Sequence, residues 1–373
     1  MTDRSSNACR IALTAMLSLM TASLPAMAKY ELVSGPAEND PAGVSIYKLD
    51  NGLTVYLTEN HQTPRFYSEI VVRAGHKEDP ATNTGLAHYL EHLLFKGSQK
   101  LGTLDYDKER EHIEKINELY EQRFHETDPE KRDAIYAQIN EQTQAGAAYV
   151  VPNEMSSLYK QMGGTGLNAH TWFDETVYKI GLPANRLKQW AVIESDRFAD
   201  PVFRLFVTEL EVVYEEKNRA MDNKDRLVFE AMAQKLFKKH PYGQQTTLGD
   251  VEHLKNPSLQ AVRDYYETYY VPNNMAIAIS GDIDKQATME LIDEHFSSWE
   301  AKPLPPRGVF EEEPLTEREH VTVEFDAEPY VLMAYRTPGR NHPDAEALVL
   351  ADMVLSNSTA GLIDINLVQS QKL

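Results

Sequence analysis

The residues best suited to chemistry are two histidines and a glutamate within five positions of one another. His88, Glu91 and His92 lie in a segment with leucines at helical spacing, and Thr84 is a plausible N-cap for that helix. Residues four apart share one face of a helix, so His88 and His92 direct their imidazoles toward one point. Such a pair suits a tetrahedral Zn²⁺ ion, and a carboxylate beside it can deprotonate the attacking water. The simpler alternative is an exposed helix with two surface histidines.

A second acidic stretch has the spacing to complete such a site. Residues 203–220 are predicted to form a helix that carries Glu209, Glu215 and Glu216. Glu209 and Glu216 are seven apart, so they lie on one face about 10 Å apart along the axis. A carboxylate from this helix would give a His₂Glu zinc site with an open fourth position, the catalytic form of zinc. By spacing alone, the stretch is only an acidic helix, and acidic helices are usually solvated faces.

The elements around these helices indicate an α+β fold. Two strands at 44–50 and 53–57 flank a hairpin turn at Asn51-Gly52, and a third strand at 66–74 precedes the histidine helix. Residues 105–160 are charged and helical in period, broken at Asp128-Pro129, which predicts an inserted helical hairpin without a chemical role. Residues 163–166 form a glycine-rich turn, and 171–182 read as one strand. His170 beside it is expected to be a structural residue rather than a metal ligand.

The remainder repeats strands and helices. Helices are predicted at 186–199, 257–270, 284–299 and 344–355, strands at 275–280, 320–325 and 330–336, and a linker at 301–314.

Composition narrows the possible functions. The 373 residues carry a net charge of −20, which argues against binding to nucleic acid or to anionic membranes. Residues 1–28 have a basic start, an apolar run and a small-x-small end, which predicts a signal peptide cleaved after Ala28 and a periplasmic or secreted protein. No stable membrane span is expected after cleavage. The only cysteine, Cys9, would leave with the signal, so histidines and carboxylates must supply any metal ligands.

With these residues in view, the chain resembles the M16 family of zinc metallopeptidases, the group of pitrilysin, insulin-degrading enzyme and mitochondrial processing peptidase. The resemblance rests on several segments in the same order as in the family. They are 85–97 with its His-x-x-Glu-His pattern, typical of inverzincins, then Asn168-Ala169, then 209–216, and further matches at 240–243, 270–275 and 281–283.

The resemblance implies a role for each site residue. His88, His92 and Glu216 would bind Zn²⁺, Glu91 would be the general base, and Glu209 an auxiliary carboxylate. Glu215 is the rival ligand, but it lies about 100° around the helix from Glu216, and the family's ligand follows the auxiliary glutamate by seven. Asn168 and Ala169 would bind substrate backbone by β-augmentation.

The resemblance also implies two similar lobes, each an antiparallel-rich sheet packed with helices. We predict a catalytic lobe at 29–200 with the charged insert, and an incomplete second lobe at 201–373 whose first helix supplies the third ligand. The family's active unit pairs two such halves, so this chain is expected to be a fragment, or to need a missing C-terminal half or a second M16 subunit.

The predicted function is therefore an exported zinc endopeptidase acting on peptides or unfolded protein segments. Two alternatives stay open: a non-catalytic scaffold or partner subunit, and a binding module in which zinc is structural.

Overall fold

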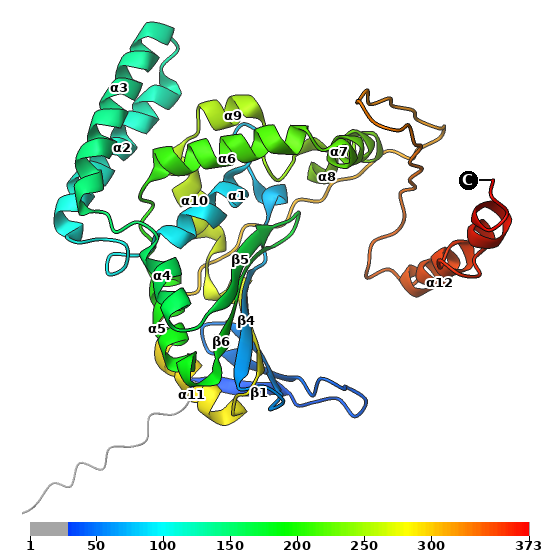
Figure 1. The fold of residues 1–373 in the computed structure, drawn as a ribbon, viewed down its shortest axis with the longest axis horizontal. Helices are drawn as coiled ribbons and strands as arrows, with labels where there is room; N and C mark the ends of the chain where they lie inside the picture. The colour runs from blue at the N-terminus through cyan, green and yellow to red at the C-terminus, as the bar shows by residue number, and fades with distance from the viewer. Residues whose placement is uncertain (1–28, 373) are drawn as a thin grey trace, which may run out of the picture.

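A computed structural model describes residues 29–372, and its centre is one seven-stranded sheet (Figure 1). In spatial order the strands are β1 (Tyr30–Ser34), β2 (Ser45–Leu49), β3 (Thr54–Glu59), β7 (Met275–Gly281), β4 (Arg65–Val72), β6 (Thr176–Pro183) and β5 (Thr165–Thr171). Strands β3 and β7 are parallel, and every other neighbouring pair is antiparallel. The α+β class predicted from the sequence is confirmed.

The sheet buries one face under helices. In β3, Val55 and Leu57 are fully buried while Tyr56 between them is 39% exposed, the alternation of a strand in a sheet with one solvated face. The predicted hairpin at Asn51-Gly52 joins β2 and β3, and Gly52 adopts a φ of +91° that favours glycine. The Asn51 amide donates to the carbonyls of Phe296, the last residue of helix α11 (Lys285–Phe296), and Trp299 just beyond it, which fixes the turn to that helix.

Most helices lie where the sequence predicts them. They are α1 (Leu86–Leu93), α2 (Tyr106–His125), α3 (Pro129–Gly146), α4 (Glu154–Gln161), α5 (Leu187–Ala199), α6 (Phe206–Met221), α7 (Lys224–Leu236), α8 (Pro241–Gln244), α9 (Val251–Lys255), α10 (Leu259–Tyr269), α11 (Lys285–Phe296) and α12 (Ala345–Leu355). Short turns of helix occur at His76–Glu78, Leu94–Lys96, Ala147–Tyr149, Ala184–Arg186, Pro272–Asn274 and Asp364–Val368. Helices α2 and α3 form the predicted charged hairpin and project away from the sheet (Figure 1).

Three strand predictions were wrong. Residues 171–182 do not form one strand: Thr171 ends β5, a turn follows, and Thr176 begins β6. Residues 320–325 and 330–336 form no strand, because the described residues offer them no neighbouring strand, and their side chains are mostly exposed. Alternating apolar residues fit a half-buried strand, but a strand needs partners to be stable.

The expected second sheet is also not formed in residues 29–372. Strand β7 lies between β3 and β4, so the segment from α6 to α11 completes the first sheet. The predicted division at residues 200 and 201 therefore does not separate two sheets. No helix in the described part of the chain is both long and apolar enough to span a membrane. The predicted signal peptide, residues 1–28, lies outside the described residues.

Candidate metal centre

The histidine helix α1 is held against the core by its leucines. Leu86, Leu90 and Leu93 are at most 2% exposed. The predicted cap Thr84 was wrong, because its hydroxyl contacts His253 and accepts the Asp250 N–H. Instead, the buried carboxylate of Asp79 accepts the N–H groups of Gly85 and Ala87 at 2.7 and 2.9 Å. This carboxylate satisfies donors at the helix start that would otherwise have no partner.

Helix α6 lies beside α1 and brings its carboxylates to the histidines. The Tyr89 hydroxyl of α1 donates to the Phe206 carbonyl at the start of α6, and the two rings are 4.8 Å apart. This contact fixes the first turn of α6 against the middle of α1.

A buried ion pair just before α6 also holds α6 in place relative to α1. Arg204, two residues before α6, pairs with Glu109 of α2 at 2.7 Å, and both side chains are 1% exposed. Its guanidinium also donates to the carbonyls of Lys96, Ser98 and Leu101 in the loop that follows α1. The charged hairpin therefore has a structural role, because α2 helps to set the position of α6 relative to α1.

The structure brings His88, His92 and Glu216 together. The Nε2 atoms of both histidines lie 3.6 Å from Glu216 Oε2, and one donor atom from each residue lies within 4.8 Å of the others. The histidine rings are 4.8 Å apart. This donor set, two imidazoles and one carboxylate, fits Zn²⁺. Glu215, the rival ligand, is exposed and does not belong to the group.

Burial keeps His88 ready to bind a cation. Burial, with a smaller contribution from the neighbouring His92, lowers the pKa of His88 to about 3. The imidazole is therefore neutral at pH 7, the form that binds metals. The nitrogen that faces Glu216 is Nε2, while Nδ1 is buried on the other side of the ring without a hydrogen-bond partner among the described residues, so Nε2 is the ligand atom.

Glu209 lies behind His92 rather than in the donor group. Its Oε2 is 3.4 Å from His92 Nδ1, and its Oε1 is 2.5 Å from Lys96 Nζ. Burial alone would raise the pKa of Glu209, but the hydrogen bonds with His92 and Lys96 outweigh it and hold this pKa below its usual value. An ionised Glu209 favours the His92 tautomer with a proton on Nδ1, which leaves Nε2 free to bind a metal.

Glu91 lies on α1 between His88 and His92 in the sequence, and its carboxyl group is buried as an acid–base catalyst's often is. It is 7% exposed, and its Oε2 accepts a hydrogen bond from the Thr171 hydroxyl at 2.7 Å. Burial raises the pKa of Glu91 to about 7, against a smaller opposing effect of the Thr171 hydrogen bond. A carboxyl with a pKa near neutrality is well suited to both accept and return a proton.

The raised pKa of Glu91 predicts a pH-dependent difference in stability for the metal-free protein. Ionising Glu91 costs more in the folded than in the unfolded chain, so the wild type is destabilised as pH rises from 4.5 to 7. Replacing Glu91 by glutamine removes this cost. The variant should exceed the wild type in free energy of unfolding by roughly 3 kcal/mol above pH 7 and equal it below pH 4.5. Urea unfolding with a chelator at pH 4 and pH 8 measures this, and an equal difference at both would contradict it.

Asn168 and Ala169 lie on β5, at the edge of the sheet. Strand β5 pairs only with β6 in the described sheet, so its other edge is free of strand partners. Asn168 is exposed and Ala169 is buried, and Thr171, which contacts Glu91, ends the same strand. The free edge therefore leads directly to Glu91.

Three contributors to the site escaped the sequence analysis: Thr171, Lys96 and Asp79. Lys96 had a signal, since it follows His92 by one helical turn. Thr171 lies in the segment that resembles the family after Asn168-Ala169, but its contact with Glu91 could not be foreseen. Asp79 had no signal, because its contact with α1 depends on how the loops fold.

Two profiles of one peptidase family match the chain. "Insulinase (Peptidase family M16)" matches residues 54–120, and "Peptidase M16 inactive domain" matches residues 257–373. The first profile includes His88, Glu91 and His92.

Several relatives of known or probable peptidase function are similar to the chain at low sequence identity. The chain is 23% identical to the zinc protease PqqE of Helicobacter pylori, over 87% of the chain and 64% of that protein. It is 25% identical to the probable zinc protease PqqL of Haemophilus influenzae, over 76% of the chain and 26% of that protein. The beta subunit of the mitochondrial-processing peptidase of Rattus norvegicus matches at 23%, over 83% of the chain and 53% of that protein. The chain therefore spans between a quarter and two thirds of these relatives' lengths.

Solved structures show the same fold. The crystal structure of pitrilysin matches with a TM-score of 0.56 and 22% identity, over 75% of this chain and 26% of that one. A protease from Helicobacter pylori matches with a TM-score of 0.54 and 21% identity, over 75% of this chain and 53% of that one. These structures show the fold alone, whereas the two profile matches and the ordered motifs within them identify the family: this chain belongs to the M16 family of peptidases.

Proposed function

We propose that this protein is a zinc-dependent endopeptidase. The observation that carries the proposal is the convergence of His88, His92 and Glu216 beside Glu91. Three protein ligands with one open position are the arrangement of catalytic zinc sites. Bound zinc supplies Lewis acidity, which acidifies water and polarises a carbonyl group.

The residues of the chain would then divide the work. Glu91 takes a proton from the water that attacks the peptide carbonyl and returns it to the leaving amine. Thr171 holds the Glu91 carboxylate through its hydroxyl, and Glu209 holds the His92 ring from behind. Glu91 therefore transfers the proton, and Thr171 and Glu209 orient the side chains of Glu91 and His92 by hydrogen bonds.

The substrate we propose is a peptide or an unfolded protein segment. An extended chain can add to the free edge of β5 near Asn168 and Ala169, so that backbone hydrogen bonds bind it without regard to sequence. Because a strand edge pairs only with an extended backbone, a folded protein would have to unfold locally before it could bind there. From residues 1–28 we further propose export to the periplasm or the exterior.

A second candidate is a zinc-binding member that needs another half or subunit to hydrolyse peptides. The chain matches 53% of a relative named as a beta subunit and 26% of pitrilysin. Because the resemblance implies two lobes, we propose that residues after 300 contribute to the second one. Bound zinc with no hydrolysis by the wild-type chain would favour this candidate.

The test is zinc-dependent hydrolysis of an unstructured, fluorescently quenched peptide. We expect cleavage by the zinc-loaded chain, its loss after chelation and its recovery when zinc is returned. Cleavage that persists in the chelated, metal-free protein would contradict the proposal.

Lys96 offers a quantitative test of whether the Lys96–Glu209–His92 contacts strengthen zinc binding. Replacing it with methionine removes the cation that holds Glu209, and Glu209 then holds His92 less firmly. Zinc affinity should fall by roughly 10- to 100-fold, the usual effect of losing a group behind a ligand. The control is Lys100→Met, since Lys100 is 80% exposed and pairs with Asp196 instead. Competition with a chromophoric chelator measures both variants, and equal affinities would contradict the role of Lys96.

A further inference from the structure

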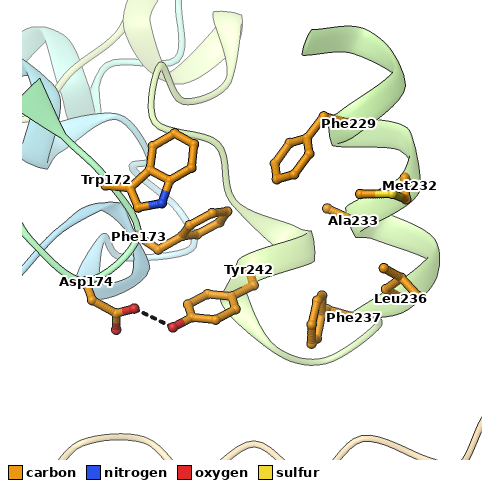
Figure 2. A pocket seen from close by; sticks show the side chains of 9 residues that line it. All are labelled: Trp172, Phe173, Asp174, Phe229, Met232, Ala233, Leu236, Phe237 and Tyr242. Carbon is orange, nitrogen blue, oxygen red and sulfur yellow. Dashed lines mark hydrogen bonds between the residues drawn. The ribbon is translucent and has the colours of Figure 1, made fainter. Parts of the chain in front are cut away.

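A pocket of about 290 Å³ opens beside the end of β5 (Figure 2). One wall is the turn after β5, with Trp172 and Phe173. The opposite wall is α7, where Phe229 faces Trp172, and Tyr242 of α8 closes one side (Figure 2). Trp172 is 53% exposed and Phe229 is 38% exposed, so the mouth of the pocket is apolar and accessible.

The wall formed by the turn is firmly anchored. The Tyr242 hydroxyl and the Lys77 ammonium both donate to the Asp174 carboxylate, which ties the turn to α8. Behind it, the buried His76 ring packs against Phe173 at 4.6 Å. A Cβ at Gly75 would lie 2.1 Å from the Trp172 carbonyl, so the backbone packs closely here. The pocket is therefore held by the fold rather than left between loose side chains.

The pocket is continuous with the candidate site. Trp172 directly follows Thr171, whose hydroxyl contacts Glu91. One residue of strand spans about 3.3 Å. A peptide paired with the edge of β5 therefore passes Glu91 and reaches the mouth of the pocket within a few residues.

Size and charge define what the pocket accepts. Its volume is at the lower limit for small-molecule sites, which suits one large side chain. Asp174 is the only charged group in the lining, and Lys77 already pairs with it. The remaining lining is aromatic and aliphatic, so an uncharged, apolar side chain fits best.

We propose that this pocket binds a large apolar or aromatic side chain of the substrate, a few residues from the bond that is cut. The proposal rests on the proposed function, because it requires a peptide on β5. Trp172 and Phe229 would then set specificity, while the backbone of β5 supplies affinity that does not depend on sequence.

Peptide binding to a Glu91→Gln chain tests the proposal without turnover. The probes are labelled, unstructured peptides that differ at one position, carrying glycine, alanine, leucine or phenylalanine, with that position moved along the sequence. We expect the phenylalanine and leucine peptides to bind at least about tenfold more tightly than the glycine peptide in one register. Fluorescence anisotropy measures the affinities.

Variants assign the preference to the pocket. Phe229→Ala should reduce it by enlarging the pocket, and Ala233→Trp should abolish it by filling the pocket, with thermal melts to confirm folding. Tyr56→Ala removes an equally exposed aromatic residue on β3 and should leave the preference unchanged. Equal affinity for all peptides, or an equal loss in Tyr56→Ala, would overturn the proposal. Zinc binding in the same samples is a separate readout: peptides bound without preference, with zinc present, reject the pocket alone, whereas absence of zinc rejects the proposed function.

Discussion

Replacing Glu91 by glutamine is expected to lower peptide hydrolysis by roughly 10²- to 10⁴-fold, the range for a lost general acid–base group. Glutamine has the same shape and still accepts the Thr171 hydrogen bond, but it cannot take a proton from water. Because Glu91 is not in the donor group, the variant should keep its zinc. Steady-state hydrolysis and zinc content, measured on the same sample, test both parts.

Glu211→Gln is the control for this substitution. Glu211 is an exposed carboxylate on α6, so its loss should change hydrolysis little. If Glu91→Gln hydrolysed the peptide as fast as the wild type, Glu91 would not be the base. If it lost zinc as well as activity, the effect would be structural, and the assignment of Glu91 would have no support from this experiment.

The second large effect is expected at Glu216. Glutamine at this position removes the negatively charged carboxylate that lies beside both imidazoles and would bind the metal directly. Zinc affinity should therefore fall by more than about 100-fold, which exceeds the loss expected when a group behind a ligand is removed. Hydrolysis at limiting zinc should fall with it. Chelator competition measures the affinity.

The neighbouring Glu215 provides a matched control. It has the same chemistry, is one residue away and points to solvent. Glu215→Gln should bind zinc as the wild type does. The reverse result, with Glu215→Gln losing zinc and Glu216→Gln keeping it, would show that α6 is rotated relative to the structure described.

Sequence was sufficient for the centre of the site because helical geometry is local. His88 and His92 lie one turn apart on α1, and the seven-residue spacing of Glu209 and Glu216 fixes their common face on α6. That these two helices meet is a tertiary fact. It depends on the Tyr89 contact with Phe206 and on the buried Arg204–Glu109 pair, which spacing along the chain does not encode.

The fold was predictable in its pieces and less so in its assembly. The hairpin at Asn51-Gly52 and the break at Asp128-Pro129 depend on local turn and capping preferences, and both formed. Strand β7 was predicted as a strand, but its position between β3 and β4 needs a long-range pairing that periodicity does not specify. The strands expected at 320–325 and 330–336 had the right pattern and no partner within the described residues.

The residues that position the site's side chains, Asp79 and Thr171, were the least predictable from the sequence. Asp79 caps α1 from six residues before Gly85, and Thr171 reaches Glu91 from the sheet, 80 residues along the chain. Neither contact follows a sequence rule, since each depends on where loops and strands lie after folding.

The most direct test of the account is the position of zinc itself, located by anomalous diffraction at the zinc edge in crystals of the zinc-loaded chain. The account predicts one peak per chain, with His88 Nε2, His92 Nε2 and a Glu216 oxygen each at about 2.0–2.2 Å from it. A peak held by other residues, or zinc-loaded crystals with Glu216 turned away from both imidazoles, would contradict it.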